Sequence, residues 1–97
     1  MLNSRQRAQI RGMAYTYEAI FQVGKGGIND QLIKQVDEAL EARELIKMRV
    51  LEPCPDTSRI AADTIAERVG ADVVQVIGYR FILYRESKTN KTIKLVR

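Results

Sequence analysis

Residues 19–51 constrain the fold most strongly, because they predict a strand, a helix and a second strand in succession. A short apolar run at 19–23 is followed by a segment, 28–43, in which apolar residues recur at helical spacing. The run 45–51 then alternates between apolar and charged residues, as half-buried strands do. Two strands joined by a helix favour parallel pairing, so this segment predicts a partly parallel sheet.

The second of these strands is expected to have one apolar and one cationic face. Ile46, Met48 and Val50 point to one side of the pleat. Lys47 and Arg49 alternate with them and point to the other side. We therefore expect two cations on the polar face of the sheet, where they are open to a ligand unless a helix covers them.

The rest of the chain predicts two further helices and a closing hairpin. Residues 3–17 and 58–69 carry apolar residues at helical spacing, next to residues that can cap a helix. The runs 72–77 and 80–84 are rich in β-branched and aromatic residues and form a predicted hairpin. The expected fold is an α/β two-layer sandwich of three helices and a mixed four-stranded sheet, in the order α-β-α-β-α-β-β.

Length and composition exclude several classes of protein. The 97-residue chain, with 45% hydrophobic and 29% charged residues, is expected to be one domain over 1–97, with 88–97 as an edge strand or a loose basic tail. No apolar run approaches the roughly 20 residues that span a bilayer, and the N-terminus lacks a signal-peptide core, so we expect a cytoplasmic protein without a membrane partner. Nothing in the sequence indicates an oligomeric state.

The side chains available for chemistry are few. The chain contains no histidine and one cysteine, Cys54, so zinc sites of the Cys/His type and histidine-activated nucleophiles are excluded. Cys54 is expected to be an inert thiol. We predict no catalytic residue, no metal site, no cofactor and no small-molecule substrate, and hence no enzyme.

Charge is distributed unevenly along the chain. Residues 1–25 hold four basic and one acidic residue, 26–79 hold six and ten, and 80–97 hold six and one. Basic ends around an acidic middle favour one surface built for a polyanion. The alternative is that the net charge of +4 only aids solubility.

The loop between the first predicted strand and the central helix is Gly24-Lys25-Gly26-Gly27. Glycines at a helix start allow an anion to approach backbone N–H groups. A nucleotide-binding P-loop requires the lysine after the last glycine, and a dinucleotide fingerprint requires a glycine where Asn29 stands, so both are excluded. Two alternatives stay open: a G-x-x-G loop that clamps a nucleic-acid backbone, or a tight turn that needs positive φ.

Three blocks of sequence carry a resemblance to a known family: "LNSRQRAQIRGMA", "FQVGKGGINDQLIKQVDEALEARELIKMRVL" and "VVQVIGYRFILYRESK". From residue 2 to about residue 95 the chain resembles the CRM domain family (chloroplast RNA splicing and ribosome maturation), in its small bacterial, stand-alone YhbY-type form. The resemblance implies a fold similar to the C-terminal domain of translation initiation factor three, with a KH-like G-x-x-G loop at 24–27. It also implies binding of ribosomal RNA in precursors of the large subunit, whose assembly the protein would assist.

The expected function is therefore non-enzymatic RNA binding, and the alternative is a protein–protein adaptor whose basic surface docks an acidic partner. The residues expected to bind RNA are Gly24, Lys25, Gly26, Gly27, Arg5, Arg7, Arg11, Lys47 and Arg49. Within this set, the spacing of Arg7 and Arg11 predicts one helical stripe that follows adjacent phosphates.

Further side chains are expected to assist. Tyr15, Tyr17 and Tyr79 are the candidates for stacking on bases, because the other aromatic residues lie in apolar runs that predict core positions. Four cations near the C-terminus are expected to extend the positive field without defining a site: Arg85, Lys88, Lys91 and Lys94.

Overall fold

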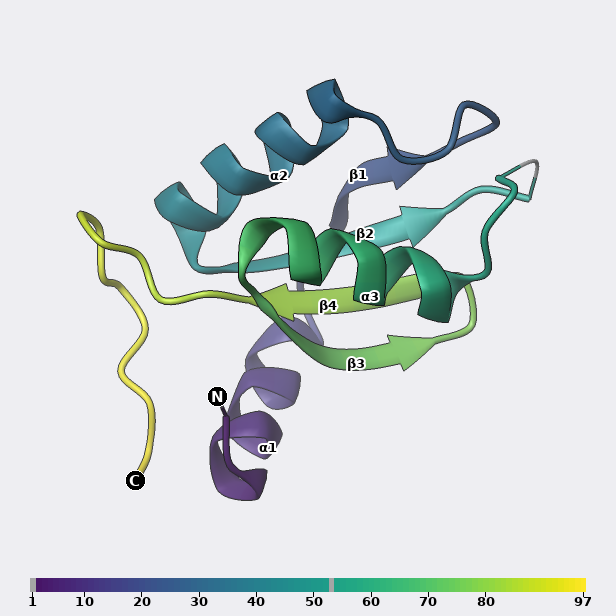
Figure 1. Cartoon of the computed structure of the whole chain (residues 1–97). Helices are drawn as coiled ribbons and strands as arrows, with labels where there is room; N and C mark the ends of the chain where they lie inside the picture. Colours follow the sequence, from purple (N-terminus) through teal and green to yellow (C-terminus); the bar gives the residue numbers. More distant parts are fainter. Residues whose placement is uncertain (1, 53) are drawn as a thin grey trace.

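The computed structural model describes residues 2–52 and 54–97 and confirms the expected order of elements (Figure 1). These are α1 (Ser4–Ala14), β1 (Ala19–Val23), α2 (Asp30–Arg43), β2 (Leu45–Val50), α3 (Ser58–Val69), β3 (Asp72–Ile77) and β4 (Arg80–Tyr84). The four strands form one mixed sheet in the order β1-β2-β4-β3. β1 and β2 pair in parallel, and both remaining pairs are antiparallel.

The main hydrophobic core lies between the sheet and helices α2 and α3, which cover the same face (Figure 1). Apolar residues of both helices pack there on the inward-facing residues of the strands. The core includes Val36, Leu40, Ile46, Met48, Ile65, Phe81 and Leu83. The predicted alternation of β2 is thus confirmed on its apolar side.

Helix α1 adds a third layer to the two that were expected, because it lies on the opposite face of the sheet. Its apolar stripe, Ile10 and Ala14, is completely buried. These residues form a second core cluster with Leu45, Ile82 and Tyr84 of the sheet. A short amphipathic helix must bury its stripe against another element, and the other face was already occupied.

Local signals in the sequence explain where the helices begin and end. Asn3 and Gln6 form a reciprocal capping box at the start of α1. Thr57 caps α3, and Gly70 ends it with a φ of 69°. Helix α1 ends at Ala14, before the predicted end at residue 17, so two of the candidate tyrosines lie in the connection to β1.

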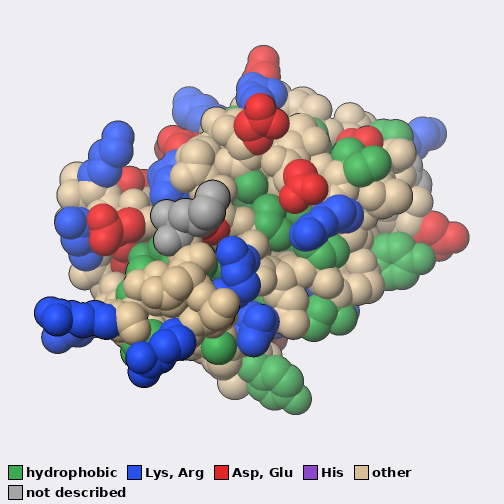
Figure 2. Space-filling view, turned by 60° about the horizontal axis from the view of Figure 1, so that its bottom comes forward, with side chains coloured by type: hydrophobic (Ala, Val, Ile, Leu, Met, Phe, Trp, Pro, Cys, Tyr) green, Lys and Arg blue, Asp and Glu red, His purple; other side chains and the backbone are tan. Residues whose placement is uncertain are grey.

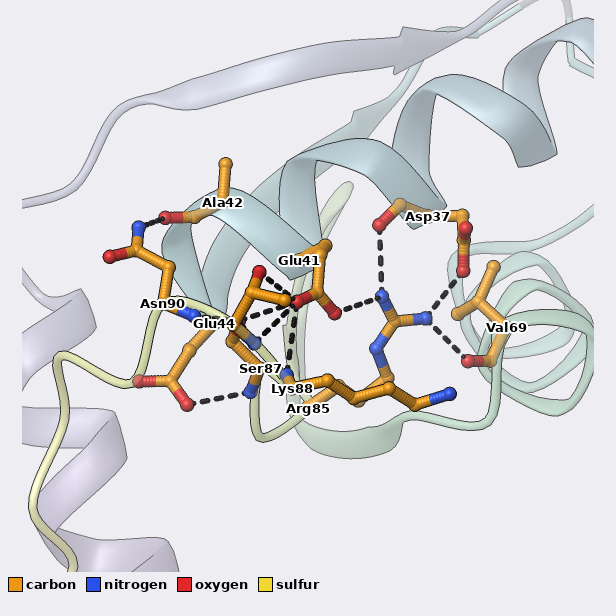
Figure 3. Close-up of polar contacts among 10 residues, drawn as sticks. Asp37, Glu41, Ala42, Glu44, Val69, Arg85, Ser87, Lys88 and Asn90 are labelled. Carbon is orange, nitrogen blue, oxygen red and sulfur yellow. Dashed lines mark hydrogen bonds and ion pairs between the residues drawn. The ribbon is translucent and has the colours of Figure 1, made fainter.

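The C-terminal segment 85–97 contains no strand, and it is held to the end of α2 by hydrogen bonds. Glu41 accepts hydrogen bonds from the N–H groups of Lys88 and Thr89 and from the hydroxyls of Ser87 and Thr89 (Figure 3). The hydrogen bond from the Ser87 hydroxyl contributes most to lowering the pKa of Glu41 from 4.5 to about 2. The segment is therefore fastened at its start.

Glu44, which is fully buried, holds the next part of this segment. Its carboxylate accepts hydrogen bonds from the N–H groups of Ser87, Thr92 and Ile93. Burial raises the pKa of Glu44, but together these hydrogen bonds outweigh burial, and the pKa is lowered. Glu44 is the C-cap residue of α2 and connects it to β2. Among the described residues it is the only non-glycine with positive φ (66°), and this conformation reverses the chain between the two elements.

After its contacts with Glu44, the C-terminal segment runs along α1 at residues 94–96. The side-chain amides of Gln6 and Gln9 donate hydrogen bonds to the carbonyls of Val96 and Lys94. The N–H of Val96 donates back to Gln9, and Leu95 packs on the cluster beneath α1. Residues 88–97, expected as an edge strand or a loose basic tail, thus form no strand and are hydrogen-bonded to α1 and to the end of α2.

Candidate nucleic-acid interface

Helix α1 covers only part of its face of the sheet and leaves one row of side chains open. Residues paired across neighbouring strands share a face. Gln22 of β1 pairs with Arg49 of β2, which pairs with Arg80 of β4, which pairs with Ile77 of β3. All four are exposed, and we call them the open row.

A groove lies beside the open row, between the end of α1 and the sheet. Its volume is about 230 Å³. It is lined by Arg11, Tyr15, Lys47, Gln75, Ile77, Arg80, Phe81 and Ile82. Three of these residues are cations and none is a carboxylate, so the groove is suited to an anionic ligand.

The glycine loop lies at the same end of the sheet as the open row, because only Val23, the last residue of β1, separates Gln22 from Gly24. The N–H of Gly27 donates to the carbonyl of Gly24 at 2.9 Å, which closes a tight turn with Lys25 and Gly26 at its centre. Gly27 has a φ of 69°, whereas a Cβ on Gly26 would meet nothing within 4 Å. The loop thus has one glycine that the turn requires and one that faces open space.

Beside this loop is a shallow hollow of about 340 Å³. Glycine backbone and uncharged side chains line it: Gln22, Gly24, Gly26, Gly27, Asn29, Gln31, Leu32 and Gln35. Asp30 does not line the hollow; its carboxylate pairs with Arg68 of α3 at 3.1 Å. The negative charge at the start of α2 is therefore partly compensated on the side of α3.

The structure brings together three of the predicted cations and separates two others. Arg11, Lys47 and Arg49 lie at the groove or on the open row. Arg5 is exposed on α1 but does not line the groove. The guanidinium of Arg7 donates to the carbonyls of Val73 and Val74 on edge strand β3, so Arg7 and Arg11 do not form the predicted stripe.

Arg80 belongs to this surface, although it was absent from the predicted site. The available signal was the two-residue spacing of Arg80 and Ile82 in the last strand, which places both side chains on one face of the sheet. Arg85 shows the reverse. It was expected to extend the positive field, but its guanidinium bonds the Asp37 carboxylate and the backbone carbonyls of Asp37 and Val69 (Figure 3).

Figure 2 shows the molecule from the side of α1. Lys and Arg side chains gather at the left and lower left of this view, over α1 and the C-terminal segment. The three lysines of that segment are exposed: Lys88, Lys91 and Lys94. The Nζ atom of Lys91 lies 3.7 Å from Oε1 of Glu86. Two tyrosines are prominent outside the core: Tyr15 is 86% and Tyr79 64% exposed.

Comparison with known sequences identifies the family. Residues 2–85 match the sequence model of the CRS1/YhbY (CRM) domain. The chain belongs to the CRM domain family. In this CRM chain the match extends over all three helices and all four strands, so it includes the loop, the groove and the open row. Most of the C-terminal segment lies beyond the matched residues.

The relatives found match nearly the whole chain. The Bacillus subtilis protein named "Probable RNA-binding protein YqeI" is 47% identical over 95 residues, which are 98% of this chain and 99% of the relative. A Haemophilus influenzae protein named "RNA-binding protein" is 28% identical over 90 residues, 93% of this chain and 91% of the relative. The solution structure of SAV1595 from Staphylococcus aureus superposes with a TM-score of 0.82 at 47% identity, covering 99% and 100% of the two chains.

One further property concerns membranes. In the described part of the chain, no helix has the length and apolar character needed to cross a bilayer.

Proposed function

We propose that this CRM protein binds RNA, mainly through the phosphate backbone, and that it does so without catalysis. The observation that carries this proposal is the gathering of Arg11, Lys47, Arg49 and Arg80 on the open part of one sheet face. Cations on one face neutralise adjacent phosphates and release counterions, which supplies most of the affinity of backbone-directed binding. The names of the relatives support RNA as the partner.

The glycine loop is proposed as a second phosphate contact. Lys25 is exposed at its centre, and the uncharged hollow beside it leaves the backbone of Gly24 and Gly26 accessible. Glycines without side chains permit close approach of phosphate oxygens to N–H groups. Together the loop and the open row would track a backbone along one end of the sheet.

The finer proposal is that the RNA is ribosomal RNA in precursors of the large subunit, bound in the cytoplasm, where the protein assists assembly. It rests on the family resemblance and on the physical character of the surface. Many cations and few exposed aromatic residues suit recognition of RNA shape and backbone more than of sequence.

The test compares two charge-matched double variants in binding to purified ribosomal RNA at several salt concentrations. If about five phosphates are neutralised, log affinity of the parent falls with log salt at a slope of roughly −3 to −5. Arg49→Ala/Arg80→Ala is expected to reduce that slope by about two, one for each lost phosphate contact. Lys34→Ala/Arg43→Ala removes the same charge from α2, which covers the other face of the sheet, and should change the slope little.

Two results would contradict the proposal. One is equal loss of affinity in both double variants, which would indicate that only net charge matters. The other is binding of an acidic protein with the same dependence on Arg49 and Arg80, which would favour an adaptor with an acidic partner.

A further inference from the structure

Tyr15 occupies an unusual position for an aromatic side chain. It directly follows the last residue of α1, it lines the groove, and it is 86% exposed. Aromatic rings dominate burial in cores and interfaces, so a ring left in water beside a cationic groove has apolar surface available for a ligand.

The groove supplies three kinds of contact next to this ring. Ile77, which is 62% exposed, adds a second apolar surface. The amide of Gln75, which pairs across from Ile82, can both donate and accept hydrogen bonds. Cations supply the third contact: Arg11, Lys47 and Arg80.

These contacts together fit one chemical group. A planar ring with hydrogen-bonding edges, attached to phosphates, is a nucleotide. The volume of about 230 Å³ is below the roughly 300–1,000 Å³ of pockets that enclose drug-sized ligands. The groove is therefore suited to a group no larger than a single base. In a duplex the bases are stacked inside the helix, whereas an unpaired base can turn into a protein groove without the cost of breaking a base pair.

We propose that the groove receives one unpaired base of the bound RNA, stacked on Tyr15, while Arg11, Lys47 and Arg80 contact the flanking phosphates. Gln75 bonds the edge of that base. This inference rests on the proposed function, and it adds a preference for RNA with unpaired nucleotides over continuous duplex. An acidic peptide would use the cations but would leave the exposed ring without a partner.

The experiment uses a single RNA strand of about ten nucleotides with the fluorescent base 2-aminopurine near its centre, and the same strand annealed to its complement. Anisotropy of an end-labelled copy measures binding, and 2-aminopurine fluorescence measures stacking. The full chain is compared with Tyr15→Phe, Tyr15→Ala and, as the matched control, Tyr79→Ala, whose ring is also exposed but lies outside the groove.

The parent and Tyr15→Phe should bind the single strand and quench its fluorescence. Tyr15→Ala should lose the quenching and bind roughly five-fold or more weakly, at an unchanged melting temperature, because stacking on one base is lost. Tyr79→Ala should behave like the parent, and the duplex should not depend on Tyr15.

Each other outcome has a distinct meaning. Anisotropy that rises without any change in 2-aminopurine fluorescence would overturn the base-binding groove and leave the proposed function standing. Loss of quenching in Tyr79→Ala in place of Tyr15→Ala would also overturn it. If the parent binds neither RNA at low salt, the proposed function itself fails, and this inference fails with it.

Discussion

At the scale of single residues, the two adjacent loop glycines have different roles. Gly27 has a φ of 69°, and a Cβ there would lie 3.4 Å from Cγ of Pro55. Gly26 has an ordinary φ and open space around it. The turn therefore depends on Gly27, whereas Gly26 is free to serve a ligand.

This difference gives a prediction with two arms. Gly27→Ala should lower the free energy of unfolding by about 1 kcal/mol, because an L-residue is strained at positive φ. Gly26→Asp should leave the melting temperature unchanged but greatly weaken RNA binding, because its carboxylate would face phosphate. Thermal melts and RNA titrations on both variants check this. A folded Gly26→Asp variant that binds RNA like the parent would leave the loop as a turn only.

Sequence alone could predict some of the site residues and not others, for physical reasons. The alternation in β2 was enough to place Lys47 and Arg49 on the polar face. The role of Arg7 was not predictable, because its carbonyl partners lie on edge strand β3, at the point where the register shifts between Val73 and Gln75. A bulge of this kind depends on pairing with another strand, and helical spacing carries no information about it.

At the scale of elements, the fastening of the C-terminal segment to α2 depends on ionised carboxylates. The pKa of Glu41 is lowered to about 2, so its contribution to stability is present above the ordinary value of 4.5 and is lost as pH falls towards 2. The guanidinium of Arg85 lies 3.7 Å from the Glu41 carboxylate.

We therefore expect the melting temperature of the parent to fall more steeply than that of Glu41→Gln between about pH 5 and pH 2. At pH 7 the variant should melt lower and lose its C-terminal segment faster to limited proteolysis. Glu38→Gln, an exposed change on the same helix, is the control. Parallel pH profiles for the parent and Glu41→Gln would show that this carboxylate does not hold the segment.

The sequence predicted the helices and strands well, because helical spacing, alternation and caps are local signals. The path of residues 85–97 was not predictable in this way. It depends on hydrogen bonds from Ser87, Thr92 and Ile93 to Glu44, which lies more than forty residues earlier in the chain. Such contacts exist only once the sheet has brought both segments together.

At the scale of the whole molecule, the strand order decides which cations meet. Arg80 is far from Arg49 in sequence, and the two are opposite one another because β4 lies beside β2. The sequence predicted a mixed sheet without this order, so it did not predict the row. Nor did it show that α1 would cover one end of that face and leave the other open.

The molecule as a whole is expected to bind RNA without altering it. This expectation follows from the proposed function, and the names of the relatives describe binding alone. Purified protein incubated with ribosomal RNA, ATP or GTP and magnesium should leave all three intact on gels and in phosphate-release assays. Turnover that co-purifies with the protein and disappears on substitution of a single carboxylate would contradict this.

The contact of Arg7 with β3 also affects how the molecule meets copies of itself. β3 is an edge strand, and edge strands present unpaired carbonyls and N–H groups onto which a strand of another chain can add. The guanidinium occupies the carbonyls of Val73 and Val74. A strand added at this edge would have to compete with the Arg7 guanidinium for these two carbonyls, so we expect Arg7 to disfavour edge-to-edge association through β3.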